Sequence, residues 1–325
     1  MKHLVIAGAL LLGALPAQAC DVCGLFLGVQ PHDRTSSFGL FYRYRLLEGD
    51  IASPALAPGL RLLKHGGHSE APAGTVERYR ELYQVMELRA DLWLGERWNV
   101  MVQLPLVNNY QSINGYSSAD LYGMSDPVVL GRYLVANTKC GPDEDRTVHR
   151  FMLGGGVKLP LGRHDLDYRG EAVAPDLQPG SGSWDGLATA EYIVRRGSFG
   201  GMVNTIGRFN GADDQGYARG HGLSSTAELF LVREGKKLSW APSVGAYSEW
   251  LAHDRQDGEE LAGTGGSTVF AHVGSRVWWR SWVLTLYYQR AIVSSMGELM
   301  VPNRERLITG IAYNLIRNTN VKPTP

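Results

Sequence analysis

The chain has 325 residues, and its 32 Lys and Arg balance its 32 Asp and Glu. This zero net charge argues against a nucleic-acid-binding domain, which should carry a clear basic excess. With 44% hydrophobic and 20% charged residues, the composition also excludes a disordered chain. Beyond residue 20 no apolar run approaches the ~18 residues of a membrane helix, which excludes a helical membrane protein but leaves a β-barrel open.

The first element is an export signal over residues 1–19. Lys2 supplies a positive start, an apolar stretch follows to Leu15, and Ala17 to Ala19 form a small-x-small cleavage site. The mature chain is therefore expected to begin at Cys20. Lipidation of Cys20 is a minority alternative, because Ala17 stands where a lipoprotein signal usually has Leu.

Twelve alternating runs follow, bounded by turn residues. They cover 37–46, 82–94, 97–105, 126–135, 149–159, 184–194, 198–208, 221–233, 237–250, 267–279, 281–291 and 304–315. Strands of soluble proteins are usually about 5–6 residues long, whereas tilted membrane strands need about 9–11, and these runs fit the second length. The prediction is an all-β, up-and-down antiparallel transmembrane barrel of about twelve strands over 37–315. Residues 20–36 are expected to be a periplasmic segment that could act as a plug or latch, and 316–325 are expected to be a tail.

The two faces of these runs differ. In 82–94, Met86 and Leu88 fall on one face, while Glu87, Arg89 and Asp91 fall on the other. Lipid requires the apolar face outside, so the charged face is expected to line a polar interior. The predicted lumen-lining residues are Arg43, Arg45, Glu87, Arg89, Asp91, Arg132, Lys158, Glu191, Arg208, Glu228, Glu249, His272 and Arg276. With Arg306 added, the inward faces carry eight basic and five acidic residues. This basic excess predicts a mild preference for anions if water passes through the barrel. The alternative is a closed barrel in which these charges pair with one another.

The connections alternate in length. Short ones lie at 95–96, 195–197, 234–236 and Arg280; long ones lie at 47–81, 106–125, 160–183, 209–220, 251–266 and 292–303. Bacterial outer-membrane barrels have short periplasmic turns and long external loops, so we expect the outer membrane of a Gram-negative bacterium with both termini periplasmic. Tryptophans lie near strand ends, as aromatic girdles do. They are Trp93, Trp98, Trp240, Trp278, Trp279 and Trp282 near short turns, and Trp184 and Trp250 at the other end. A secreted soluble β-protein is the alternative.

Two segments carry a family resemblance. They are GMSDPVVLGRY at 123–133, and GGVKLPLG at 155–162 followed by DLQPGSGSWD at 176–185. They resemble the outer-membrane transporter barrels of phenol meta-cleavage operons, a group loosely similar to long-chain fatty-acid and aromatic-hydrocarbon transporters. The resemblance implies passage of a small hydrophobic or amphipathic molecule.

The motif loop of the second segment comprises Asp176, Pro179, Gly180, Gly182 and Trp184. The two glycines permit positive φ, and Pro179 stiffens the approach. Trp184 is expected to anchor the next strand at the outer interface. We favour a structured turn over a substrate-contacting loop.

Three cysteines, Cys20, Cys23 and Cys140, all fall on the expected periplasmic side. Because the periplasm is oxidising, a disulfide between two of them is the leading interpretation. The alternative is a thiolate site for copper or zinc, with His32 or His149 as a further ligand. The Cys-x-x-Cys-Gly start resembles a subset of such barrels, although Leu25 stands where that subset has another Cys.

No catalytic residues and no cofactor are predicted. The sequence contains no P-loop, dinucleotide fingerprint or HExxH motif. The Ser–His pairing that comes nearest to a catalytic arrangement is His221 with Ser224 or Ser225, and no acidic residue is placed to orient this histidine. His65 and His68 are expected to be solvated loop residues.

The predicted function is a porin-like outer-membrane channel or transporter. Its expected partners are membrane lipid and an unidentified small molecule, and no nucleic acid. A non-conducting structural barrel and a metal-handling barrel are the rival hypotheses.

Overall fold

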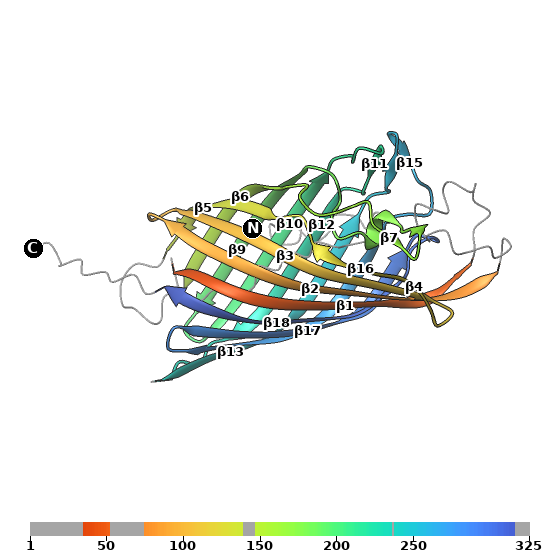
Figure 1. The fold of residues 1–325 in the computed structure, drawn as a ribbon. Helices are drawn as coiled ribbons and strands as arrows, with labels where there is room; N and C mark the ends of the chain where they lie inside the picture. The colour runs from red at the N-terminus through yellow and green to blue at the C-terminus, as the bar shows by residue number, and fades with distance from the viewer. Residues whose placement is uncertain (1–34, 53–74, 139–146, 236, 316–325) are drawn as a thin grey trace, which may run out of the picture.

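The computed structural model describes residues 35–52, 75–138, 147–235 and 237–315, and they form a closed antiparallel barrel of twelve strands (Figure 1). The barrel strands are β1 Ser36–Ala52, β2 Val76–Leu94, β3 Trp98–Ile113, β5 Val128–Asn137, β6 Val148–Lys158, β9 Asp185–Arg196, β10 Phe199–Asn210, β12 Gly222–Leu231, β13 Leu238–Leu251, β16 Gly266–Trp279, β17 Trp282–Met296 and β18 Asn303–Leu315. Each predicted run corresponds to one of these strands, so the predicted fold class is confirmed. Within the described ranges, no helix is long and apolar enough to cross a membrane.

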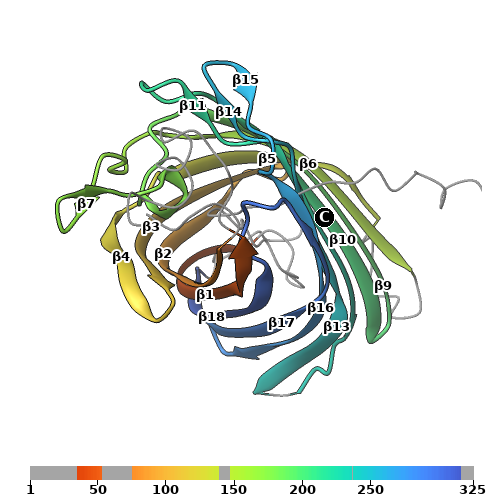
Figure 2. The same ribbon diagram turned by 90° about the vertical axis from the view of Figure 1, so that its right-hand side faces the viewer.

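The sheet closes because β1 pairs with β18, the last strand, and β2 pairs with both β1 and β3. Ring closure removes the exposed strand edges that would invite aggregation. Figure 2 looks into this ring from the end that carries the long connections, which we call the long-loop end; the opposite end is the short-turn end.

The prediction of a long loop at 106–125 is wrong. The C-terminal half of β3 continues through residues 106–113 and pairs with β4 Tyr116–Met124. The N-terminal half of β3 pairs with β5. The strands β1 and β2 also run farther than predicted, to Ala52 and from Val76. The added part of β2 includes the outward Arg78 and Arg80 as well as the inward Glu77 and Glu81. With charges on both faces, the apolar–polar alternation that signals a strand fades.

The outer face is apolar and the inner face polar. In β2, Met86 and Leu88 are 48% and 56% exposed, whereas Glu87 between them is fully buried. Six tryptophans are exposed on the outside, namely Trp98, Trp184, Trp240, Trp250, Trp279 and Trp282. The girdle prediction is wrong for Trp93 and Trp278, which are buried because their strand parity places them on the inner face.

The long connections carry small elements of their own. Residues 159–184 contain the hairpin β7 Asp167–Tyr168 and β8 Glu171–Ala172 and the short 3-10 helix η1 Pro175–Leu177. Strand β11 Tyr217–Ala218 joins β14 Arg255–Gln256 and β15 Glu259–Glu260 in a separate three-stranded sheet. These pieces cluster at the long-loop end, at the right of Figure 1.

Candidate functional site in the barrel interior

All thirteen predicted lumen-lining side chains are buried or half-buried, and most of them are ion-paired. The first group surrounds Glu87, whose carboxylate contacts Arg43 Nη2 at 3.1 Å and Arg89 Nη2 at 2.6 Å. Gln103 Nε2 donates a further hydrogen bond to Glu87 at 2.9 Å. Buried carboxylates need such partners, because an isolated buried charge is strongly unfavourable.

The second group is centred on Arg132, which is only 2% exposed. Its guanidinium reaches Asp91 on β2 at 3.0 Å and Glu191 on β9 at 3.8 Å, each two strands away from β5. Arg150 on β6 adds a 2.7 Å contact to Glu191. This group joins β2, β5, β6 and β9 on their inner faces.

A third group crosses the barrel. Glu249 on β13 contacts Arg45 on β1 at 3.0 Å and also pairs with Arg306 on β18. Strands β16, β17 and β18 separate β13 from β1 in the sheet order, so this contact spans the interior rather than following the wall. Tyr247 donates to Glu249 at 2.7 Å, and Arg45 Nε donates to Asn303 Oδ1 at 2.8 Å. We call Arg45, Glu249 and Arg306 the cross-lumen bridge.

The remaining group holds Glu228, His272 and Arg276. His272 Nε2 lies 3.8 Å from Glu228, and Gln289 Nε2 lies 2.9 Å from His272 Nδ1. Tyr287 donates to Glu228 from three strands away at 3.4 Å. Arg276 lies over the Tyr287 ring, 5.8 Å from its centroid.

A cavity of about 40 Å³ remains inside, lined by Arg43, Lys158 and Arg208 together with apolar side chains such as Val107 and Ile206. Such a volume holds about three water molecules and excludes an organic solute. A solute larger than these waters therefore enters this cavity only if the side chains that line it move.

The anion preference suggested by the eight-to-five count has no basis in the described interior. Buried or half-buried bases there are Arg43, Arg45, Arg89, Arg132, Arg150, Lys158, Arg208, Arg276 and Arg306. The acids are Glu77, Glu81, Glu87, Asp91, Asp126, Asp185, Glu191, Glu228 and Glu249. Nine bases face nine acids.

The sequence reasoning missed several of these residues. Arg150 shares strand parity with Lys158 on β6 and was detectable, while Glu77 and Glu81 lay beyond the predicted strand. Asp126 and Asp185 stand inside the two family motifs, but nothing in the sequence showed that they meet.

The two motifs form one buried structure around Lys158. Lys158 Nζ lies 3.2 Å from Asp126 and 2.6 Å from Asp185, and it also contacts Ser181 Oγ. All three charged side chains are at most 3% exposed. Asp126 accepts hydrogen bonds from the Gly162 and Ser181 N–H groups at 2.9 and 2.8 Å. We call this group the Lys158 anchor; it fixes both ends of the 159–184 connection to the barrel wall.

The glycines and proline of the motif loop serve close packing. Gly180 lies against the backbone of Gly162, where a Cβ would overlap with the carbonyl group. Pro179 packs on Gly123 of the other motif, and Gly182 has a φ of +67°. Trp184 is 64% exposed at the start of β9. Pro179, Gly180 and Gly182 thus each have a structural reason, which is a packing contact for the first two and a left-handed backbone for the third.

The anchored segment folds into the mouth of the barrel. Val173 and Leu177 join a buried apolar cluster with inward residues of β1 and β2, including Leu47 and Tyr79. Asn109 of β3 donates to the carbonyl of Leu177 at 2.9 Å. Side chains of 173–178 therefore cover part of the long-loop opening from within.

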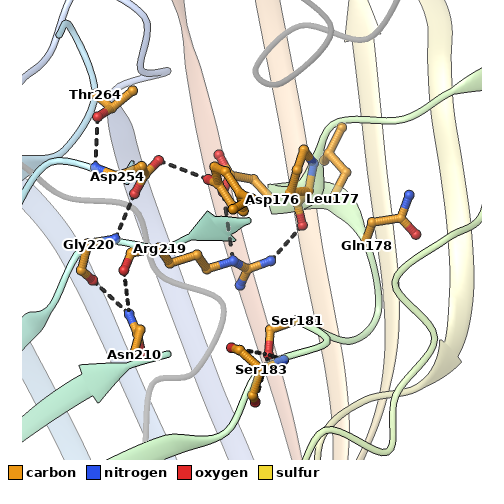
Figure 3. A network of polar contacts seen from close by, with 12 residues as sticks. Asp176, Leu177, Gln178, Ser181, Ser183, Asn210, Arg219, Gly220, Asp254 and Thr264 are labelled. Carbon is orange, nitrogen blue, oxygen red and sulfur yellow. Dashed lines mark hydrogen bonds and ion pairs between the residues drawn. The ribbon is translucent and has the colours of Figure 1, made fainter. Parts of the chain in front are cut away.

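A polar network joins this segment to the two following loops (Figure 3). Tyr217 donates to Asp254 at 2.9 Å and to Asp176 at 3.4 Å, and the Gly220 N–H donates to Asp254 at 2.8 Å. Arg219 donates to the Pro175 carbonyl at 2.6 Å and faces Asp176 at 3.9 Å. Asp176 is thus a structural link between loops.

The short-turn end of the interior is filled by apolar side chains. Met202, Phe230, Trp278 and Val283 pack in one cluster there, and Trp93, Leu134 and Met152 form another. The interior is therefore layered, with apolar contacts at both ends and paired charges between them.

The predictions on cysteine chemistry stay untested, because Cys20, Cys23 and Cys140 lie outside the described residues, as do His32, His65 and His68. Within the described ranges, no three His, Asp or Glu side chains are grouped to hold a metal ion. His149 Nδ1 instead lies 2.7 Å from the Tyr192 hydroxyl. His221 Nδ1 accepts from the Asn210 N–H, and Ser225 pairs with Thr205, so His221 and Ser225 are engaged elsewhere.

No family model matches the sequence, and no curated protein matches it. Among solved structures, an outer membrane channel from Pseudomonas putida F1 superposes with a TM-score of 0.58 at 13% identity, covering 91% of this chain and all of that chain. The β domain of the Bordetella autotransporter BrkA gives a TM-score of 0.46 at 10% identity, over 87% of this chain and all of the other. The translocator domain of the autotransporter NalP from Neisseria meningitidis gives 0.37 at 12% identity, over 88% and 90%.

The likeness to the Pseudomonas channel covers nearly the whole chain and shows a shared fold, the closed twelve-stranded barrel of an outer-membrane channel. At 13% identity it assigns no role to any residue. The similar solved structures reported above are channels and translocator barrels.

Proposed function

We propose that this protein is a channel or transporter of the Gram-negative outer membrane, through which small hydrophobic or amphipathic molecules pass passively or by facilitated diffusion. The observation that carries the proposal is the closed barrel with an apolar outer face and a polar inner face, superposable over 91% of the chain on an outer membrane channel. The long loops face the exterior, and both termini lie in the periplasm, following the general architecture of such barrels.

The substrate class is supported by the resemblance of the 123–133 and 155–185 motifs to barrels of phenol meta-cleavage operons. The structure adds a physical constraint. With nine acids facing nine bases in the described interior, a purely apolar solute would have to pass a polar layer. An amphipathic molecule, such as a phenol with one hydroxyl group, fits this layer better than a hydrocarbon does.

The cross-lumen bridge is the proposed gate, because it spans the interior between strands that are not neighbours. The same pairing also favours the rival hypothesis of a non-conducting structural barrel, since paired buried charges can serve stability alone. Removing the charge of Glu249 separates the two hypotheses.

The test is planar-bilayer conductance and phenol flux into vesicles, measured on the folded mature protein and on Glu249→Gln. A gate predicts low conductance for the wild type and a several-fold increase for the variant. A structural barrel predicts silence in both proteins, with a loss of stability in the variant. Exposed Glu234→Gln, in a turn at the short-turn end, is the matched control and should leave conductance unchanged.

A further inference from the structure

The described turns at the short-turn end are strongly basic. Their charged residues are Arg97, Arg195, Arg196, Arg233, Lys237 and Arg280, against Glu96 and Glu234. We call these six bases the basic rim. Five of them are exposed and Arg195 is half-buried. Because the whole chain has zero net charge, this excess of four is local.

The opposite end has the opposite sign. In the described connections after residue 158 at the long-loop end, the bases are Arg163, Arg169, Arg219 and Arg255. The acids there are Asp165, Asp167, Glu171, Asp213, Asp214, Asp257, Glu259, Glu260 and Glu298, in addition to the buried Asp176 and Asp254. The surface charge is therefore separated along the barrel axis, so general solubility does not account for the basic rim.

The basic rim adjoins aromatic residues of the same end, of which Tyr133 is half-buried and Trp279 is exposed. The Arg97 guanidinium lies 6.0 Å from the Tyr133 ring centroid and donates to its hydroxyl at 2.9 Å. Arg280 lies 5.5 Å from the centroid of the exposed Trp279 ring. Exposed aromatic rings on a membrane barrel mark the headgroup level, so the neighbouring guanidinium groups lie where lipid phosphates are found.

Arginine suits this position chemically. Its guanidinium group is weakly hydrated and offers paired N–H donors that match two phosphate oxygens. Within the described turns, Arg195 pairs with Glu234 at 2.8 Å. Clusters of Lys and Arg beside a membrane attract anionic lipids, and they do so less at high salt.

We propose that the basic rim binds the anionic headgroups of phospholipids in the leaflet that the short-turn end contacts. This inference depends on the membrane insertion in the proposed function, but it concerns a surface that the transport path does not use. Binding fixes the depth and tilt of the barrel in the bilayer from this end.

The experiment uses tryptophan quenching by brominated lipids. In a W184F/W250F background, all remaining tryptophans lie toward the short-turn end. The mature protein is inserted into phosphatidylcholine vesicles that contain either brominated phosphatidylglycerol or the same fraction of brominated phosphatidylcholine. Three proteins are compared: this background, R196Q/R233Q/R280Q on the basic rim, and R163Q/R169Q/R255Q at the long-loop end as the charge-matched control. Heat-modifiable electrophoretic mobility reports barrel folding and insertion separately.

The background protein and the loop-end control are expected to be quenched at least about twofold more by phosphatidylglycerol at low salt, with the preference shrinking at 0.5 M salt. The rim variant is expected to lose most of this preference. Equal quenching by both lipids in inserted protein, or an unchanged preference in the rim variant, would overturn the inference alone. Failure of every variant to insert would overturn the proposed function and this inference with it.

Discussion

Replacing Lys158 by Met is expected to destabilise the barrel by about 3 kcal/mol. Lys158, Asp126 and Asp185 are each at most 3% exposed, so removing the ammonium leaves two buried carboxylates facing each other. Breaking a buried ion pair by removing one partner typically destabilises by about 3–5 kcal/mol. The lower end of that range applies, because Asp126 keeps hydrogen bonds from Gly162 and Ser181 and Asp185 keeps that from Ser183. The folding equilibrium constant should fall about a hundredfold.

The assay is reversible urea unfolding in phosphatidylcholine vesicles, followed by tryptophan fluorescence. Lys237→Met, at an exposed turn residue, is the control and should shift the free energy of unfolding by no more than about 0.5 kcal/mol. The triple variant D126N/K158M/D185N should recover most of the stability, since it buries no charge. A Lys158→Met protein within about 0.5 kcal/mol of the wild type would refute the reasoning that this anchor is a tightly coupled buried group.

Three further predictions concern the loop and the terminal segment. Gly180→Ala should destabilise the protein by about 1–3 kcal/mol and displace the 159–184 connection from the mouth, because the new Cβ would overlap with Gly162. Limited proteolysis should then cut within 159–184. The control Gly155→Ala should stay resistant, because its Cβ meets only an ordinary 3.6 Å contact. Maleimide labelling of the denatured, non-reduced mature protein should modify one of Cys20, Cys23 and Cys140 if two of them form a disulfide; three modified thiols would contradict the disulfide. Deleting residues 20–33 should raise conductance if this segment is a plug or latch, and an unchanged single-channel conductance would argue against that hypothesis.

The predicted faces of the strands agree closely with the observed burial where lipid and interior differ most in polarity. In β2 the exposed Met86 and Leu88 alternate with the buried Glu87, as the period of two requires. The agreement fails where polarity no longer distinguishes the two sides. At the long-loop end Glu77, Arg78 and Arg80 are all charged although they lie on opposite faces, and the start of β2 was placed too late.

The contacts between motifs were beyond the sequence for a different reason. Both motifs were visible in the chain, and a structured turn was the favoured interpretation. That Lys158 of one motif joins Asp126 and Asp185 depends on β5, β6 and β9 lying side by side. Trp93 and Trp278 show a different limit, because the girdle prediction used only their position near strand ends, whereas their strand parity places them on the inner face.

The sequence by itself determined the fold class, the twelve strands and the inward face of most of them, because an apolar–polar period of two is a local property of a strand between lipid and a polar interior. Only the tertiary structure decided that Arg45 meets Glu249 across the barrel, that acids and bases are equal in number in the described interior, and that residues 173–178 cover part of the mouth from within. These contacts join residues far apart in the chain. Their proximity follows from closure of the sheet and the stagger between its strands, which no local pattern records.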